Sequence, residues 1–521
     1  MRLLRTRSEL LSWQRQEPDR PLHFVPTMGA LHGGHQCLLR RAGEPRAGRQ
    51  PRVLLSVFVN PLQFGAGEDF ARYPRDLERD AELAAAAGAE ALFAPDASVI
   101  YPDGLEGGTR VLAPAPLQLE LCGRSRPRHF DGVATVVCRL LALVRPDRLL
   151  LGEKDWQQLV ILRRVVADLG LPLMVQGCAT VRGAGDLALS SRNRYLQGDE
   201  RRQALALPAA LRDLAGVAAS GAPAGPLLDR VRQRLQDAGL EIDYVQLVAA
   251  HTLTPLTHVR ELSLLAAAVH CGSARLIDHV FLMPRPPIVA IDGPAGAGKS
   301  TVTRALAARL GLVYLDTGAM YRAVTWWVMQ NGADPEDAVA VAPLLEDLDL
   351  QLSLDGAGAQ RVRVNGQDVS EAIRSPEVTA LVSQVAAHGC VREALTRQQQ
   401  RLGEKGALVA EGRDIGTAVF PDAECKVFLT ATVSERARRR SEDLRQRGFP
   451  VPPLSELEAS IAERDQRDAS REVAPLRQAE DAVELITDGL SIEAVIQALV
   501  DLFHQKVPEE AWPGPGGQAG A

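Results

Sequence analysis

Short apolar runs alternate with amphipathic stretches along the first 180 residues or so of the chain. The apolar runs lie at 23–25, 53–59, 91–94, 149–151 and 174–179. Between them, residues 76–87 place acidic side chains in a first turn and end at Gly88, which is typical of a helix. Buried runs separated by helices indicate a parallel sheet with helices on both faces. The first half is therefore predicted to have an α/β fold.

The pattern changes after Leu196, where the sequence becomes rich in Ala, Leu and Arg. A break rich in Pro and Gly at 221–226 and an apolar run at 264–269 predict a smaller subdomain of helices and short strands. Residues 279–287 contain three prolines, a composition typical of a linker. We therefore predict a boundary close to residue 283.

A new apolar run at 288–291 leads into the sharpest motif of the chain. Gly293, Gly298, Lys299 and Ser300 satisfy the phosphate-loop pattern G-x-x-x-x-G-K-[ST], and a helix-forming run follows at 301–309. The glycines let backbone N–H groups turn toward a phosphate, Lys299 reaches the outer phosphates, and Ser300 would hold Mg²⁺. A glycine-rich turn that arose by chance is the alternative, and the strand before the motif and the helix after it argue against that alternative.

Composition limits the classes of function. The 521 residues are 46% hydrophobic and 24% charged, with a net charge of only −6. The length predicts about two to four domains, and the mixed charges favour neither a nucleic-acid nor a membrane partner.

The cysteines and the N-terminal sequence indicate the cellular compartment of the protein. Seven cysteines without C-x-x-C spacing suit reduced thiols better than disulfides or a zinc site. The first twenty residues lack an apolar core, and no apolar run reaches the length of a membrane span. We therefore expect a cytoplasmic enzyme.

Three segments of the first half carry candidate chemistry. Residues 26–35 (PTMGALHGGH) place two histidines around glycines, where a strand turns into a helix. Residues 151–159 (LGEKDWQQL) present Lys154 and Asp155 at a strand end, and residues 189–196 (LSSRNRYL) offer hydroxyls and arginines. Surface histidines, a solvated turn and a helix cap are the respective alternatives.

Together with VNPLQFG (59–65), YPRDLERD (73–80), RPRHFDGVATVV (126–137) and ARLIDH (274–279), these segments resemble the pantoate–β-alanine ligases, over roughly residues 20–282. The resemblance implies a Rossmann-like nucleotidyltransferase domain at 1–196, a subdomain at 197–283, and ATP-dependent joining of pantoate to β-alanine through a pantoyl-adenylate. Arg128, where glycine is commoner, and Leu189, where methionine is usual, depart from the family pattern.

The roles implied by this resemblance are carried over position by position. His32, His35 and Lys154 would act on the phosphates, with His35 as the proton donor, and Gln63 and Gln158 would hold pantoate, with Gln63 also near β-alanine. The ATP contacts would come from Met28, Gly29, Ala30, Leu31, His32, Gly33, Gly34, His35, Gly152, Glu153, Lys154, Asp155, Val181, Leu189, Ser190, Ser191 and Arg192.

The second half resembles the cytidylate kinases, from Pro287 to about Gln505. The motifs are the phosphate loop, LDTGAMYRAV (315–324), a small β insertion with an Asn365-Gly366 turn, SQVAAHGCVRE (383–393), EGRDIGTAVFPDA (411–423) and ERDQRDASREVAPL (463–476). The resemblance implies a kinase domain at 284–507 that uses Mg²⁺ and ATP to phosphorylate CMP or dCMP.

Residue roles in the second half are carried over from this resemblance position by position, as in the first half. ATP would contact Gly293, Pro294, Ala295, Gly296, Ala297, Gly298, Lys299, Ser300 and Thr301, with Ser300 on the metal. Cationic clamps suit a reaction that brings two polyanions together. The acceptor nucleotide would contact Thr317, Tyr321, Arg322, Ser383, Arg392, Arg413, Asp414, Arg464, Asp468 and Arg471. Of these, Arg464, Asp468 and Arg471 have the spacing of one helical face, and the arginines at 436–440 would form a lid over ATP.

The sequence thus predicts a fusion of two enzymes that act on small-molecule substrates. A homodimer formed through the first half is also predicted. Each half has its own sheet and phosphate site, so fragments 1–284 and 285–521 are expected to fold separately. Residues 508–521 (PEEAWPGPGGQAGA) read as a disordered tail. A kinase for another acceptor, or a first half that only binds nucleotide, are the alternatives.

Overall fold

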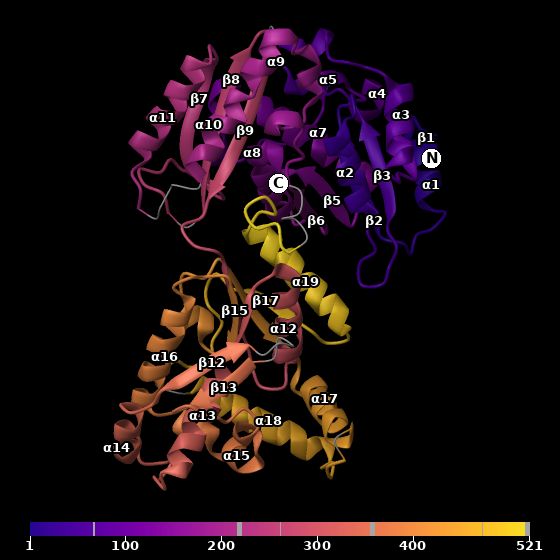
Figure 1. The fold of residues 1–521 in the computed structure, drawn as a ribbon. Coiled ribbons are helices and arrows are strands. Elements are labelled where there is room, and N and C mark those ends of the chain that lie inside the picture. The colour runs from indigo at the N-terminus through magenta and orange to yellow at the C-terminus, as the bar shows by residue number, and fades with distance from the viewer. Residues whose placement is uncertain are drawn as a thin grey trace. The chain divides into compact units, whose positions relative to one another are not determined.

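The computed structural model describes residues 1–65, 68–215, 221–260, 262–354, 360–446, 448–470 and 473–515. The chain forms two compact units (Figure 1). The first consists of Met1–Pro284 together with Pro508–Pro513, and the second runs over Arg285–Val507 and resumes at Gly514. Near its C-terminus the chain therefore returns to the first unit.

The first unit is built on a parallel six-stranded sheet in the order β1-β4-β3-β2-β5-β6. Its strands are β1 Arg2–Leu4, β2 Leu22–Thr27, β3 Arg52–Val57, β4 Ala91–Phe93, β5 Arg148–Gly152 and β6 Met174–Cys178. The apolar runs predicted as strands are confirmed, whereas the three-residue β1 was missed. Because the strand order reverses between β2 and β5, a crevice is expected at their carboxyl ends.

Helices cover both faces of this sheet, as predicted. They are α1 Arg7–Gln14, α2 Gly33–Ala42, α3 Leu77–Ala86, α4 Ala97–Ile100, α5 Gly104–Gly107, α6 Leu121–Ser125, α7 His129–Val144 and α8 Trp156–Asp168. Successive side chains of a strand point to opposite faces. Leu149 and Leu151 of β5 accordingly join the core under α7 and α8, and Leu150 joins the core under α2 and α3.

The rest of the first unit is a helical and antiparallel subdomain. Its strands β7 Glu241–Ala249, β8 Ser263–Cys271 and β9 Ala274–Leu282 form one sheet, packed by α9 Gly198–Ala204, α10 Ala206–Ala215 and α11 Ala224–Asp237. The prediction of a linker from residue 279 is wrong up to Leu282. There the alternating pattern of β9 continues, and the chain-breaking prolines begin only at Pro284.

The second unit contains a parallel five-stranded sheet in the order β11-β15-β10-β16-β17. The strands are β10 Ile288–Asp292, β11 Val313–Asp316, β15 Leu408–Gly412, β16 Cys425–Thr430 and β17 Val483–Ile486. The predicted insertion is present as β12 Leu350–Leu354, β13 Gln360–Val364 and β14 Gln367–Asp368. Asn365 and Gly366 both have positive φ, as a two-residue hairpin turn of this type requires.

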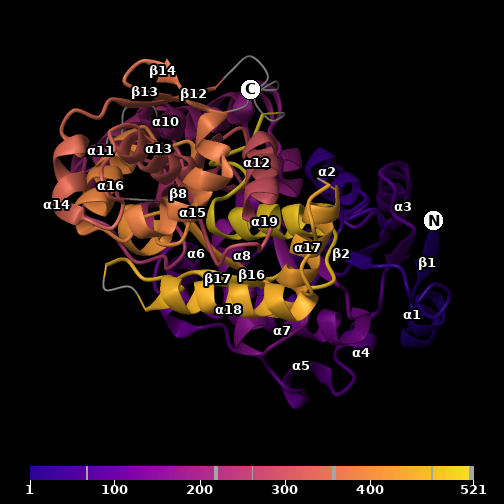
Figure 2. The same cartoon turned by 90° about the horizontal axis from the view of Figure 1, so that it is seen from below.

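The helices of the second unit are α12 Lys299–Leu310, α13 Thr317–Gln330, α14 Ala338–Val341, α15 Pro376–Val385, α16 Gly389–Gly403, α17 Val433–Gln446, α18 Leu454–Ala469 and α19 Ile492–Lys506. The arginine-rich α17 lies side by side with α18 in Figures 1 and 2. Of the predicted helical face, Arg464 and Asp468 lie on α18, which ends at Ala469, and Arg471 lies outside the described residues.

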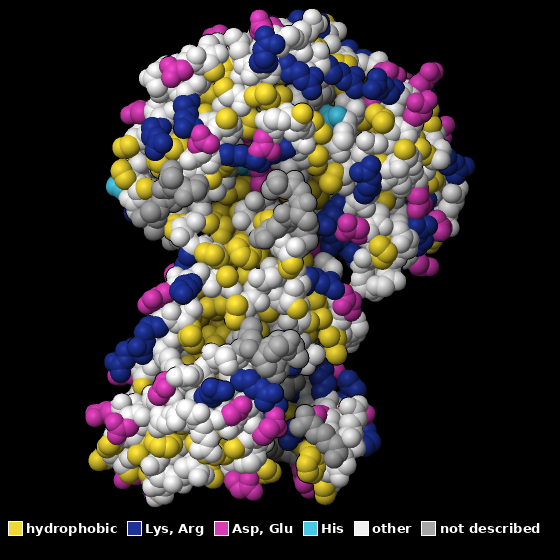
Figure 3. Space-filling view, in the orientation of Figure 1, with side chains coloured by type: hydrophobic (Ala, Val, Ile, Leu, Met, Phe, Trp, Pro, Cys, Tyr) yellow, Lys and Arg dark blue, Asp and Glu magenta, His cyan; other side chains and the backbone are white. Residues whose placement is uncertain are grey.

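The prediction of a disordered tail is wrong for residues 508–513, which pack into the first unit. Their backbone and side chains form hydrogen bonds with residues of that unit. The prediction failed because the local composition of Pro, Gly and Glu does not reveal partners that are distant in the sequence. Acidic and basic side chains are interspersed over the face shown in Figure 3. Among the described helices, none combines the length and apolarity that a membrane crossing requires.

Candidate active sites

The loop between β2 and α2 is held by a buried carboxylate. Asp80, in α3, accepts hydrogen bonds from the backbone N–H groups of Ala30 (2.9 Å) and Leu31 (2.7 Å). Gly29 has φ +84°, and a Cβ there would lie 2.8 Å from a carboxylate oxygen of Asp80. The glycine is therefore required both by the backbone and by the close approach. Sequence reasoning missed this role of Asp80, although the residue lies within a quoted motif.

His32 and His35 stand at the N-terminus of α2 and have their tautomers fixed by the backbone. His32 is the N-cap, and its Nδ1 accepts from the N–H of Gly34 (3.1 Å). Nδ1 of His35 accepts from the N–H of His32 (3.3 Å). In a neutral imidazole the other nitrogen then carries the hydrogen. Both rings therefore present an Nε2–H donor.

Electrostatics keeps these two rings uncharged at neutral pH. Burial, then the charge of Lys154, lowers the pKa of His32 to about 4. Burial, then His32, lowers the pKa of His35 to about 3. Two neutral N–H donors at a helix N-terminus can bind phosphate oxygens without neutralising their charge. A positive charge at this site comes from Lys154 instead.

Lys154 follows β5, and its Nζ lies 3.5 Å from Oδ1 of Asp155. Both residues line one cavity together with Gln158, Ser190 and Arg192. Glu153 does not join them, because its side chain is fully buried and its oxygens accept the backbone N–H groups of Glu509 and Glu510. The side chain of Glu153 therefore does not line this cavity, and the assignment of Glu153 to ATP stays a prediction.

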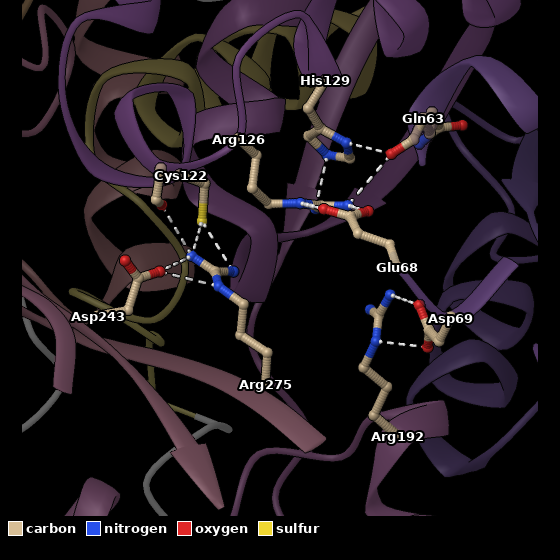
Figure 4. A network of polar contacts seen from close by, with 10 residues as sticks. Gln63, Glu68, Asp69, Cys122, Arg126, His129, Arg192, Asp243 and Arg275 are labelled. Atoms are coloured by element: carbon tan, nitrogen blue, oxygen red, sulfur yellow. Dashed lines mark hydrogen bonds and ion pairs between the residues drawn. The ribbon is translucent and has the colours of Figure 1, made fainter. Parts of the chain in front are cut away.

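Arg126 and His129 connect this cavity to a second one, of about 490 Å³, that Gln63 lines. Arg126 donates to Glu68 (2.8 and 2.5 Å) and to the carbonyl oxygen of Gln63 (3.1 Å), and His129 Nδ1 donates to the same carbonyl oxygen (2.8 Å; Figure 4). The structure thus places Gln63 and Gln158 on neighbouring cavities. Arg126 and His129 were not selected from the sequence, although both lie in a motif used for the resemblance.

The segment 181–192 contributes Leu187, Ala188, Ser190 and Arg192 to the lining of the first cavity. Arg192 forms a two-point ion pair with Asp69 (3.1 and 3.0 Å; Figure 4), and Ser191 meets the hydroxyl of Tyr73 at 3.2 Å. The backbone of Leu189 bonds to that of Val181 (2.9 Å), and its side chain lies against Gly33. Leu189 thus joins this segment to the histidine loop.

Arg128 adopts the left-handed conformation, with φ +69°, just before α7. This region favours glycine, and an arginine in it carries backbone strain. The departure of Arg128 from the commoner glycine therefore has a local backbone cost, while the fold around it is kept.

The phosphate loop of the second unit spans the turn from β10 to α12. Gly293 has φ +150°, and a Cβ there would lie 2.0 Å from the carbonyl oxygen of Leu429, so only glycine fits. Lys299 Nζ donates to the carbonyl oxygens of Gly293 (2.8 Å) and Pro294 (2.9 Å). Burial, then Arg413, lowers the pKa of Lys299 to about 8. The lysine is therefore still largely charged at neutral pH.

A cavity of about 500 Å³ opens beside this loop, within the size range of nucleotide-sized sites. The structure brings to it, of the residues predicted from sequence, Ala295, Gly296, Gly298, Lys299, Ser300, Thr301, Thr317, Tyr321, Arg322, Ser383, Arg392, Arg413, Asp414 and Arg464. Of the arginine run in α17, Arg440 lines the cavity, while Arg436 and Arg439 donate to carbonyl oxygens of Ala295 and Ala297.

Asp414 and Arg392 form a buried pair at this cavity. The guanidinium of Arg392 donates to Asp414 Oδ2 at 3.1 Å, and it lies 5.6 Å from the ring of Tyr321. The following residues are held by Asp292, whose carboxylate accepts from the N–H groups of Ile415 (2.8 Å) and Gly416 (2.7 Å). The end of β10 therefore fixes the segment that carries Asp414.

Two acidic residues complete the site. Asp468 is buried and paired with Arg413, so it orients that guanidinium from behind the cavity. Glu411, which sequence reasoning did not select, accepts from the hydroxyls of Ser300 (2.6 Å) and Tyr314 (2.8 Å). Burial, then Asp316, raises the pKa of the Glu411 carboxyl.

Comparison with known proteins matches both units. A family model described as pantoate-beta-alanine ligase matches residues 2–281, and one described as cytidylate kinase matches residues 289–505. A crystal structure of pantothenate synthetase from Thermus thermophilus is 44% identical, with a TM-score of 0.50, and corresponds over its whole length to 55% of this chain.

Full-length relatives carry both parts. A protein of Synechococcus sp. (strain CC9605) named bifunctional pantoate ligase/cytidylate kinase is 65% identical over 95% of this chain and 100% of its own length. A protein of the same name from Parasynechococcus marenigrum (strain WH8102) is 64% identical over 99% of this chain and 100% of its own. The chain therefore belongs to the family of bifunctional pantoate ligase/cytidylate kinases.

Proposed function

We propose that the chain joins pantoate to β-alanine in its first unit and phosphorylates CMP or dCMP in its second, using ATP in both reactions. The observation that carries this proposal is that each unit has its own phosphate-binding loop at the carboxyl end of its own parallel sheet. The family membership supports the same pair of activities.

In the ligase, a carboxylate oxygen of pantoate attacks the α-phosphorus of ATP, and pyrophosphate leaves. The Nε2–H groups of His32 and His35 donate to the phosphate chain, and Lys154 stabilises the charge on the α-phosphate. The amine of β-alanine then attacks the pantoyl carbonyl carbon, AMP leaves, and the amine loses a proton. Gln63 and Gln158 bind pantoate without adding a competing nucleophile.

His35 acts in this scheme as a hydrogen-bond donor, because the ring is neutral in the free protein. The role of His35 as a proton donor, expected from the sequence, concerns the ring with ATP bound and stays a prediction. Binding of the phosphate chain favours the charged imidazolium and raises its pKa.

In the kinase, a phosphate oxygen of CMP attacks the γ-phosphorus of ATP, and ADP leaves. Lys299 interacts with the phosphates of ATP, and Arg322, Arg413 and Arg464 hold the phosphate of CMP in the cavity that they line. Ser383, Arg392 and Asp414 contact the base.

Mg²⁺ fits the second unit. Ser300 Oγ and the Glu411 carboxylate lie 2.6 Å apart beside the phosphate loop, and Glu411 Oε2 is buried without a hydrogen-bond partner in the described part of the chain. Mg²⁺ takes oxygen ligands and in such sites uses one or two protein groups plus phosphates. Ser300 and Glu411 would hold the ion, which would neutralise charge on the nucleotide phosphates.

One preparation tests both activities. The purified chain is incubated with ATP and either pantoate plus β-alanine or CMP, and AMP and ADP are measured separately. Absence of pantoate-dependent AMP would remove the first activity, and absence of CMP-dependent ADP the second. We further propose that the protein is located in the cytoplasm. We also propose a homodimer through the first unit, and light scattering on the intact chain would test whether a dimer forms.

Asp414 is predicted to set the preference for cytosine. Cytosine carries an amino donor at the 4-position, where uracil has a carbonyl acceptor, so a carboxylate favours cytosine. A hydrogen bond to a charged group contributes about 1.5–3 kcal/mol, so Asp414→Asn should lower kcat/KM for CMP by about tenfold to a hundredfold. The kcat/KM for UMP should fall much less, because the amide of asparagine can also donate a hydrogen bond to the uracil carbonyl.

The matched control is Asp347→Asn, which makes the same change at an exposed turn of the same unit. Because Asp414 also pairs with Arg392, a general loss through that pair is expected to affect both nucleotides alike. Equal losses for CMP and UMP in a stably folded variant would therefore remove Asp414 from base recognition.

A further inference from the structure

Residues Pro508–Pro513, here called the C-terminal clip, contact the residue next to Lys154. The backbone N–H groups of Glu509 and Glu510 donate to the two carboxylate oxygens of Glu153, each at 2.8 Å. Glu153 is 0% exposed. A buried carboxylate needs hydrogen-bond donors, and two consecutive amides meet both of its oxygens in a geometry that a loose tail would not keep.

The side chains of the clip contact the segment that follows β6. Glu509 accepts from the N–H of Ala179 (3.1 Å), and Glu510 accepts from the hydroxyl of Thr180 (2.6 Å) and from Arg182 (2.8 Å). These three residues flank Val181, which belongs to the proposed ATP site. Glu509 also pairs with Arg41, in the last turn of α2, whose first turn carries the two histidines.

The charge of Glu510 is matched by nearby cations. Arg182 is paired at the same time with Asp278 (2.7 and 3.0 Å), and His279 Nε2 lies 3.7 Å from Glu510. Burial raises the pKa of Glu510, but His279 and Arg182 outweigh this effect and hold the pKa below its usual range. Glu510 is therefore a half-buried carboxylate whose charge is compensated, and its removal leaves Arg182 with one acceptor fewer.

We propose that the C-terminal clip positions the ATP site of the ligase, by holding the segment 153–155 after β5 and the segment 179–182 after β6 in register with each other. Glu509 and Glu510 are positioning residues in this proposal, which rests on the proposed ligase function. They act on ATP through Lys154 and Val181. Because the clip follows directly on Val507 of the second unit, residues that come after the kinase half in the chain supply a part of the ligase.

Two shortened chains test the proposal. One ends at Val507 and lacks the clip, and its matched control ends at Pro513 and keeps it. Misplacing catalytic groups by about 1 Å costs up to about a hundredfold in rate. We therefore expect kcat/KM for ATP in the ligase reaction to fall about tenfold to a hundredfold in the first chain and not in the second. The KM for β-alanine and the rate of CMP phosphorylation should stay unchanged in both.

Full-length variants separate positioning from folding. Glu510→Gln keeps an oxygen acceptor for Thr180 and Arg182, so it should retain more ATP-dependent activity than Glu510→Ala. Glu153→Gln places an amide NH₂ against one of the two donating N–H groups, so it should disturb ATP use like removal of the clip. Combining Glu153→Gln with the chain that ends at Val507 should then add little to either change alone.

Hydrogen exchange gives a readout that does not depend on activity. Peptides that contain residues 152–155 and 179–182 should exchange faster in the chain that ends at Val507 than in the chain that ends at Pro513. Equal exchange would overturn the proposal, even if the unaltered chain formed no pantoate-dependent AMP and the proposed ligase function had failed. Equal kcat/KM for ATP in the two shortened chains would also overturn it. An equal loss of kcat/KM for ATP and for β-alanine, together with a lowered melting temperature, would overturn it as well. The clip would then stabilise the first unit as a whole rather than position its ATP site.

Discussion

Replacing His35 with alanine should lower pantoate-dependent AMP formation by about a hundredfold to a thousandfold, the cost of losing one donor that stabilises developing charge. The ring is held by the backbone N–H of His32 at Nδ1, so its Nε2–H is directed by the fold rather than by the ligand. An alanine removes this donor and leaves the loop anchored by Asp80. CMP phosphorylation by the same molecules should not change, because the second site lies in the other unit.

Two further variants make this result specific. His35→Gln keeps a side-chain N–H group, so it should recover part of the lost rate. His270→Ala removes an exposed histidine of β8 in the same unit and should leave both activities intact. Pyrophosphate release near the unaltered rate in His35→Ala, with pantoate and ATP present, would contradict the role of His35.

The parts of the fold that were predictable are those that local sequence determines. The runs of β2 to β6 are short, apolar and separated by helices, so both their type and the sheet class follow from the pattern. The phosphate loop is equally local, since Gly293, Gly298, Lys299 and Ser300 form one continuous motif between a strand and a helix. The same holds for the Asn365-Gly366 turn, where positive φ at two successive positions selects the residues.

The site residues that were missed depend on distant contacts. Asp80 is 49 residues from Leu31, and Glu411 is 111 from Ser300, so neither pairing has a signature in the local pattern. The resemblance quoted the motifs that contain them but did not distinguish ligand contacts from supporting contacts. The neutral state of the histidines was also not predictable, because it follows from burial and from the neighbouring Lys154.

The C-terminal residues 508–513 show more strongly that distant contacts cannot be predicted from the local sequence. Glu509 lies 356 residues from Glu153, and a segment rich in Pro, Gly and Glu is typical of disorder when considered alone. Its contacts also change the expectation that fragments 1–284 and 285–521 are independent. A cut at 284 separates Glu153 from both amides that bond to it, so we expect the first fragment to use ATP less well than the intact chain.

Replacing Lys299 with methionine should lower CMP phosphorylation by about a hundredfold to a thousandfold or more, because phosphoryl transfer depends almost entirely on positioning and charge stabilisation. Methionine keeps much of the volume of the side chain and removes its charge. Lys405→Met, at an exposed position of the same unit, is the matched control, and pantoate-dependent AMP formation is the internal one. Unaltered ADP formation from CMP in Lys299→Met would contradict the assignment of the phosphate loop.

The pH profile gives Lys299 a second test. Its pKa in the free protein is lowered to about 8, chiefly by burial, so the lysine loses its charge as the pH rises through about 8. Since kcat/KM reports the free enzyme, kcat/KM for ATP in the kinase reaction should be highest below pH 8 and fall above it. Lys299→Arg keeps a charge that does not titrate in this range, so its residual activity should show no such decline. An alkaline decline of the same midpoint in Lys299→Arg would assign the titration to another group and leave Lys299 with a role that does not depend on its protonation.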